Sequence, residues 1–312
     1  MSGEWARLRR FMRRLDRGAA SPIPPPGLPP AYILKLEGRG ETFVRHHHGS
    51  PDAPVVLLLH GWTASADLQW CTLYPALCER YSVIAIDHRG HGRGIRSEEP
   101  FTLEDCADDA VAAVKLLEPG RQVIAIGYSM GGPITLLLWR RHPEMVAGLV
   151  FEATAMEMHD AREDRFRWRM LMFLEGILRS RRLRSWIARY LREEAFANPD
   201  LEPYVPWMLA EMRRTDPRAI VEAGHALRDF DARPFAPSID VPVASVVTTV
   251  DRVVRPVKQR ALASAARATV FEIAADHDAT LASALPFAAI TVEAVEAVRG
   301  AAVEGSSARR LA

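Results

Sequence analysis

Short apolar runs rich in valine and isoleucine alternate along the chain with longer segments whose apolar positions recur at helical spacing. Eight runs predict β-strands: Ile33–Leu36, Thr42–His46, Val55–Leu59, Val83–Ile86, Val123–Gly127, Val146–Phe151, Val243–Thr248 and Thr269–Ile273. The segments between them predict helices: Leu68–Cys78, Leu103–Leu117, Met130–Arg141, Val257–Ala266 and Pro286–Val298. Such alternation is typical of a mostly parallel sheet covered by helices. The expected fold class is therefore α/β, with one mostly parallel, eight-stranded sheet.

The alternation breaks once, in residues 154–237, where prolines separate amphipathic segments and no strand pattern occurs. Helices are predicted there at Phe166–Leu178, Leu183–Glu194 and Val205–Arg213. Because the strand pattern then resumes, we interpret this segment as an all-helical insertion into one domain. The core is then expected to comprise residues 31–153 and 238–300, followed by a flexible tail at 301–312.

Residues 1–30 have a pattern of their own. At the helical step of about 100° per residue, arginines fill one sector and large apolar side chains the other: Trp5, Leu8, Phe11, Met12 and Leu15. Residues 4–17 therefore predict a basic amphipathic helix, and six prolines between Ser21 and Pro30 form a stiff spacer after it. Three alternatives follow: the helix docks on the protein itself, it is a frayed tail, or it makes peripheral contact with an anionic membrane.

Composition excludes several classes of protein. Of 312 residues, 48% are hydrophobic and 25% charged, as in ordinary globular proteins. A net charge of +1 provides no overall field that would attract nucleic acid, so no nucleic-acid partner is expected. The three cysteines are too few for a disulfide framework or a four-cysteine zinc site. Because no apolar run reaches the roughly 18 residues of a membrane span and no secretory signal is evident, we expect a cytoplasmic protein.

The sequence GYSMGG, Gly127–Gly132, stands between a predicted strand and a predicted helix. It matches the G-x-S-x-G pattern of a nucleophile elbow, a sharp turn that projects a serine hydroxyl above the sheet. Glycines let neighbouring backbone approach the turn without a clashing Cβ, and the helix N-terminus places a positive dipole end beside the serine. We therefore predict that Ser129 is a nucleophile, in preference to an ordinary tight turn.

A serine hydroxyl needs a base that takes its proton and a third group that orients the base. Asp251 follows the seventh predicted strand and His277 the eighth. Both therefore stand at carboxyl ends of strands, where open α/β sheets place their site residues. The chain order Ser129, Asp251, His277 is the order found with this type of elbow. Glu152, at the end of the sixth predicted strand, is the reserve candidate for the acid.

Acyl transfer also needs two donors for the oxyanion of its tetrahedral intermediate. The sequence HGWTAS, His60–Ser65, follows the apolar strand VVLLL and supplies a glycine-containing turn. The candidate donors are the backbone N–H groups of Trp62 and of Met130, the residue after the predicted nucleophile.

Together these residues resemble the α/β-hydrolase superfamily, in particular its capped serine esterase and lipase-like branch, which includes non-haem haloperoxidase-like relatives. The resemblance extends over about Pro51–Val298 and includes DHRGHG, Asp87–Gly92, which looks like a structural loop of that family. It implies Ser129 as nucleophile, His277 as general base and Asp251 as its orienting acid. It further implies an oxyanion hole formed by the two backbone donors, no cofactor, and a cap, residues 154–237, that sets substrate choice.

Two positions depart from that family's pattern. Asp276 stands where a glycine usually precedes the base, and Thr249-Val250 replaces a glycine-containing turn before the acid. Through their charge, Asp276 and Asp278 are expected to raise the pKa of His277. Serine at the elbow disfavours epoxide opening and halide displacement, for which the family uses aspartate.

A metal site at the three histidines His46–His48 is rejected. Successive side chains of an extended segment point to alternate faces, and no carboxylate stands nearby at the spacing of a ligand set. No metal is therefore expected.

The expected function is hydrolysis of a carboxylic ester through an acyl-enzyme on Ser129. Apolar residues in the presumed cap favour an apolar or lipid-like small molecule: Trp168, Met170, Met172, Phe173, Trp186, Trp207 and Met208. The alternatives are a thioesterase or C–C bond hydrolase with the same three residues, and a non-catalytic binding module. The sequence does not predict acyl-chain length or oligomeric state.

Overall fold

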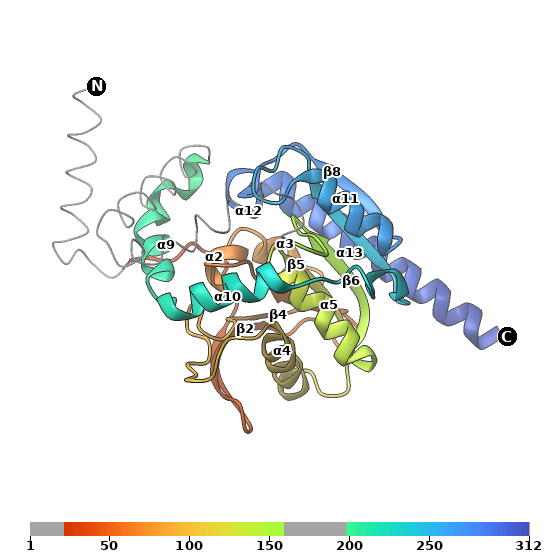
Figure 1. The fold of residues 1–312 in the computed structure, drawn as a ribbon, viewed down its shortest axis with the longest axis horizontal. Helices are drawn as coiled ribbons and strands as arrows, with labels where there is room; N and C mark the ends of the chain where they lie inside the picture. Colours follow the sequence, from red (N-terminus) through yellow and green to blue (C-terminus); the bar gives the residue numbers. More distant parts are fainter. Residues whose placement is uncertain (1–21, 159–197, 312) are drawn as a thin grey trace.

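A computed structural model describes residues 22–158 and 198–311 of the chain, and one sheet forms its centre (Figure 1). The strand order is β1-β2-β4-β3-β5-β6-β7-β8. The strands are β1 Ala31–Leu36, β2 Gly40–His47, β3 Val55–Leu59, β4 Ser82–Ile86, β5 Val123–Tyr128, β6 Val146–Glu152, β7 Val243–Thr248 and β8 Thr269–Ile273. Strand β2 is antiparallel to β1 and to β4, and the other neighbours are parallel. The prediction of an eight-stranded, mostly parallel sheet is confirmed.

Helices connect these strands and cover both faces of the sheet. The described helices are α2 Ala66–Trp70, α3 Tyr74–Cys78, α4 Leu103–Leu117, α5 Gly131–Arg141, α9 Val205–Met212, α10 Pro217–Asp229, α11 Pro256–Ala265, α12 Ala279–Ala282 and α13 Ala284–Leu311. Short 3-10 turns are η1 Pro143–Met145, η2 Pro199–Tyr204 and η3 Ala236–Ser238. Among these described helices, none combines the length and the apolar character that crossing a membrane requires.

Three expectations about helices differ from the structure. The segment predicted as one helix over 68–78 is two, α2 and α3, because Pro75 lacks an N–H and occupies the first turn of a new helix. Helix α10 was not predicted individually. Helix α13 extends past its predicted end at Val298 through residues 301–311, a region that begins with two alanines, the best helix formers; that this region is a flexible tail stays a prediction. The predicted helices at 4–17, 166–178 and 183–194 lie outside the described residues.

Strand β3 shows how the sheet divides the hydrophobic core. Its side chains belong alternately to two buried clusters, one containing Leu57 and Leu59 and the other Val56 and Leu58. Helices α4 and α5 cover the first face, and α3 and α13 cover the second (Figure 1). Because both faces are buried, the strand is an uninterrupted apolar run, which is typical of a central parallel strand.

Helices α9 and α10 pack on the loops that follow β3 and β4. The indole Nε1 of Trp62 donates a hydrogen bond to the carbonyl of Ile220 in α10 at 2.9 Å. The guanidinium of Arg93 bridges Asp67 in α2, at 2.8 Å, and Glu211 in α9, at 3.0 Å. These contacts hold the helical segment against the edge of the sheet where the parallel strands have their carboxyl ends.

Candidate active site

The turn between β5 and α5 holds Ser129 in a strained conformation. Its φ of 51° lies in the left-handed region, which non-glycine residues rarely adopt. The two glycines of the turn have no room for a side chain. A Cβ at Gly127 would lie 2.3 Å from the carbonyl oxygen of Gly131, and a Cβ at Gly131 would lie 1.9 Å from the carbonyl oxygen of Leu59. The Ser129 N–H donates to the carbonyl of Glu152 at 3.0 Å, which fixes the turn against β6. Strain held in this way by its surroundings is characteristic of functional sites.

Three loops at the carboxyl ends of β5, β7 and β8 bring Ser129, Asp251 and His277 together. The Nε2 atom of His277 lies 3.0 Å from Ser129 Oγ, and its Nδ1 atom lies 2.8 Å from Asp251 Oδ2. The imidazole therefore stands between a hydroxyl and a carboxylate. This arrangement allows Nε2 to accept the serine proton while the carboxylate holds Nδ1–H.

Four further donors fix the carboxylate of Asp251, whose side chain is fully buried. Its Oδ1 accepts the backbone N–H groups of Val253 and Val254, each at 2.8 Å. Its Oδ2 accepts the hydroxyl of Thr248 at 2.8 Å and the amide of Gln259 at 3.1 Å. These hydrogen bonds offset the cost of burying a charge and leave one orientation for the acid. Sequence reasoning did not single out Thr248 or Gln259.

Asp276, one of the departures from the family pattern, contacts Arg252 in the loop that carries the acid. Asp276 accepts the backbone N–H of Arg252 at 2.9 Å and forms an ion pair with the Arg252 guanidinium. Although burial raises the pKa of Asp276, hydrogen bonds from Arg252 and from the His277 N–H hold it below its ordinary value. The pair joins the loop that carries the acid to the loop that carries the base.

The predicted oxyanion donors, the backbone N–H groups of Trp62 and Met130, belong to segments beside Ser129. A Cβ at Gly61 would lie 3.4 Å from Ser129 Cβ, so the turn that leads to Trp62 passes directly by the elbow. Met130 is the N-cap of α5, and its N–H stands at the positive end of that helix.

The buried histidines next to this turn make structural contacts. The backbone N–H of His88 donates to Nε2 of His60 at 3.0 Å, which ties the DHRGHG loop to the turn after β3. Burial lowers the pKa of His88 to about 3 and that of His91 to about 4, so both imidazoles are neutral at neutral pH.

The reserve acid, Glu152, contacts helix α13. Its Oε1 accepts the hydroxyl of Thr291 in α13 at 2.6 Å, and its side chain is buried. Burial raises the pKa of Glu152 to about 8, against the opposing effect of the Thr291 hydrogen bond. In this structure Asp251, and not Glu152, contacts the histidine.

The variant Glu152→Gln is expected to change how stability depends on pH. The folded state keeps a proton on Glu152 up to about pH 8, whereas the unfolded chain loses it near its ordinary pKa of 4.5. Wild-type stability therefore falls as pH rises through that interval, and the neutral amide removes this loss. We expect the free energy of unfolding of the variant, relative to wild type, to rise by about 2–4 kcal/mol between pH 5 and pH 8.

Urea unfolding at the two pH values measures this difference. Glu104→Gln, at an exposed position in α4, is the matched control and should follow the wild type. Parallel stability curves for Glu152→Gln and wild type would contradict the raised pKa.

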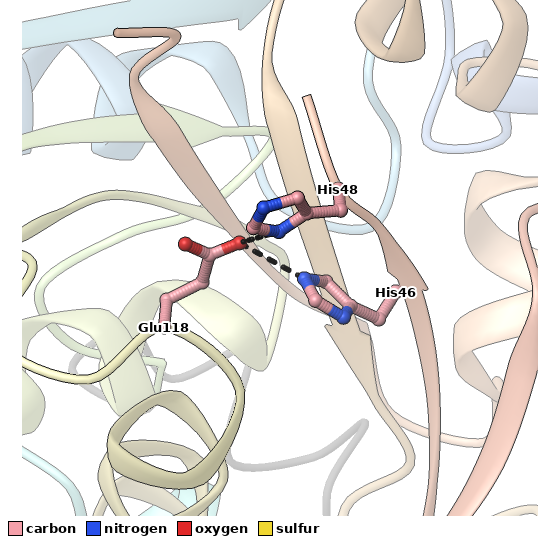
Figure 2. A group of neighbouring side chains, drawn as sticks. All are labelled: His46, His48 and Glu118. Atoms are coloured by element: carbon pink, nitrogen blue, oxygen red, sulfur yellow. Dashed lines mark hydrogen bonds and ion pairs between the residues drawn. The ribbon is translucent and has the colours of Figure 1, made fainter. Parts of the chain in front are cut away.

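Within the described part of the chain, one group of three side chains has the composition and proximity of a metal site: His46, His48 and Glu118 (Figure 2). Of the two reasons for rejecting a metal at these histidines, the absence of a nearby carboxylate is therefore wrong. The carboxylate is supplied by a residue 70 positions along the chain from His48, which only the fold brings close.

Comparison with known proteins identifies the family. Residues 54–281 match the model of the alpha/beta hydrolase fold family. The chain belongs to this family, as the resemblance of its motifs predicts.

Relatives of known name include ester hydrolases. A pimeloyl-[acyl-carrier protein] methyl ester esterase from Neisseria meningitidis serogroup C is 30% identical over 261 residues, which cover 81% of this chain and 98% of the relative. Among solved structures, a bromoperoxidase from Bacillus anthracis superposes with a TM-score of 0.73 at 19% identity, over 86% of this chain and 100% of that one. An enol-lactonase from Burkholderia xenovorans LB400 superposes with a TM-score of 0.70 at 23% identity, over 85% and 100%. At these identities the structural likeness concerns the fold.

Proposed function

We propose that the chain is a serine hydrolase that cleaves a carboxylic ester through an acyl-enzyme on Ser129. The observation that carries the proposal is the imidazole of His277, placed 3.0 Å from the serine hydroxyl and 2.8 Å from a buried carboxylate. The methyl ester esterase among the relatives supports an ester as the bond that is cleaved.

The reaction follows from these contacts. Nε2 of His277 takes the proton of Ser129 as its Oγ attacks the ester carbonyl, and the N–H groups of Trp62 and Met130 stabilise the oxyanion. The tetrahedral intermediate collapses, the C–O bond to the alcohol breaks, and the imidazolium gives its proton to the leaving oxygen. A water molecule, deprotonated by the same nitrogen, then attacks the acyl carbon and releases the carboxylic acid and free serine.

Residues 154–237 act in this proposal as a cap over the site. The hydrogen bond from Trp62 to Ile220 supports it, because it places α10 against the turn beside the elbow. Trp207 and Met208, two of the residues taken to favour an apolar substrate, pack instead in a buried cluster with Leu68 and Cys71. The proposal that the substrate has an apolar acyl or alcohol part therefore depends on the other apolar residues of the cap sequence, which lie outside the described part.

A fluorophosphonate probe tests the proposal, since it reacts with a serine that a neighbouring base activates. We expect a single adduct on the peptide that contains Ser129 in folded protein, and no adduct after denaturation. A panel of p-nitrophenyl esters graded by acyl length, run beside the matching acyl thioesters, then defines the preferred bond and chain. An unlabelled Ser129 would end the proposal, and faster thioester cleavage would favour the thioesterase alternative.

Peripheral membrane contact through residues 4–17 stays a prediction, because these residues lie outside the described part. Their basic and apolar faces are expected to bind vesicles that contain anionic lipid. Cosedimentation of the full chain, compared with a chain that begins at Gly27, measures this contact. Equal pelleting of the two proteins would contradict it.

A further inference from the structure

At the end of strand β2, two imidazoles face the same oxygen atom of one carboxylate. Nε2 of His46 and Nδ1 of His48 each lie 3.0 Å from Oε1 of Glu118. One ligand atom from each of the three residues lies within 4.8 Å of those of the other two. Figure 2 shows the rings on one side of the strand, with the carboxylate facing them from the end of α4.

Strand geometry explains why these two histidines meet. In an extended segment, alternate side chains share a face, so His46 and His48 lie together while His47 points to the other face. The same alternation of side chains that separates His47 from its neighbours therefore brings His46 and His48 onto one face. Glu118 is the C-cap of α4, and its hydrogen bonds with His46 and His48 bring the end of that helix beside the end of β2.

The site lies near the amino ends of the parallel strands, whereas Ser129 lies at their carboxyl ends. His46 is paired with Ile84, in β4, and His47 with Val83, near the amino end of that strand. Ser129 follows the carboxyl end of β5, which lies on the other side of β3 from β4. A ligand held at His46 and His48 therefore does not reach the hydrolytic site.

The carboxylate of Glu118 is buried and presents one oxygen to both imidazoles. The side chain of Glu118 is 2% exposed, and its other oxygen is paired with Arg121 at 3.3 Å. Each of the two ring nitrogens can donate an N–H to Oε1 or, with its proton on the other ring nitrogen, offer a lone pair to a metal ion beside that oxygen.

We propose that His46, His48 and Glu118 bind a divalent transition-metal cation, with zinc as the best match. Two imidazole nitrogens and one carboxylate oxygen, completed by water, form a common tetrahedral zinc ligand set. Bonds of about 2.1 Å place such donors about 3.4 Å apart, close to the observed 3.0 Å.

Small movements complete the geometry. The side chain of His48 is 68% exposed and is free to turn, whereas Glu118 is fixed by burial and by Arg121. On binding, Nε2 of His46 and Nδ1 of His48 present lone pairs to the ion, and each ring carries its proton on the other nitrogen. The bound cation joins the end of β2 to the end of α4, which stabilises the fold and leaves ester hydrolysis unchanged.

Zinc titration of the full-length, tag-free protein against a chromophoric chelator tests this site. We expect one equivalent of zinc to bind with micromolar affinity, and His48→Ala to weaken binding at least about tenfold. His47→Ala, the neighbouring histidine on the other face, is the matched control and should bind zinc like the wild type. Absence of binding by wild type, or equal weakening by His47→Ala and His48→Ala, would overturn the proposal.

Thermal unfolding provides a second readout. Zinc at about 100 times its wild-type Kd is expected to raise the Tm of wild type and of His47→Ala by about 3 °C or more, and to raise the Tm of His48→Ala by at most about half as much. Ester hydrolysis should be the same with zinc and with a chelator. Binding without any rise in Tm, or hydrolysis that requires zinc, would contradict the stabilising role.

Discussion

Ser129→Ala is expected to lower kcat for ester hydrolysis by about 10⁴-fold or more, because no other group at the site replaces the attacking oxygen. The fold should be unaffected. The Ser129 N–H donates to the Glu152 carbonyl, and the Ser129 carbonyl accepts the Thr154 hydroxyl at 2.7 Å. Both contacts use main-chain atoms of Ser129, so alanine retains them and keeps the same backbone conformation.

Stopped assays with a p-nitrophenyl ester measure this loss, and thermal unfolding of the variant checks its fold. Ser264→Ala, at an exposed position in α11, is the matched control and should retain full activity and full fluorophosphonate labelling. A Ser129→Ala variant with more than about a tenth of wild-type kcat would rule out covalent catalysis at this residue.

Asp251→Asn is expected to lower kcat by about 10³- to 10⁴-fold. If the amide oxygen keeps the two N–H groups of the following turn, the amide nitrogen must face Nδ1 of His277 and the side chain of Gln259. The histidine then accepts at Nδ1 and carries its proton on Nε2, next to Ser129 Oγ. In that tautomer it cannot take the serine proton, so the hydroxyl loses its base.

Glu152→Gln is the matched control for this variant, because Glu152 bonds to Thr291 and not to His277. Its kcat should stay within about threefold of wild type, since neither the nucleophile nor the base loses a partner. Measuring both variants under saturating ester, with thermal unfolding beside the kinetics, separates catalysis from stability. Equal losses in the two variants would show that Asp251 is not the acid that orients the base.

The central parallel strands were predictable because burial on both faces requires uninterrupted apolar runs. Strand β3 is such a run and occupies the predicted range, Val55–Leu59. The break over residues 68–78 was harder to predict, because helical periodicity continues past the point where Pro75 starts a new turn. Proline at a helix start and proline inside a helix look alike until the position of the first turn is known.

The supporting residues of the site were less accessible to sequence analysis than its main residues. Gln259 was detectable in principle, as a polar residue on the same face of α11 as buried Leu262, three positions later. The spacing of Gln259 and Leu262 indicates that the glutamine is buried, but it does not indicate that its amide binds Asp251. The ion pair between Arg252 and Asp276 has no such signal, because its members come from different loops and their spacing of 24 residues is set by the fold.

The order of apolar and polar residues determined by itself the α/β sheet, the elbow at Ser129 and the loops that carry Asp251 and His277. These are local properties, since strand periodicity and glycine-rich turns depend on neighbours in the chain. Tertiary structure alone decided which carboxylate meets the imidazole and that Glu118 meets His46 and His48. Side chains distant in sequence come within 3 Å only through packing of whole strands and helices, and no local pattern records that distance.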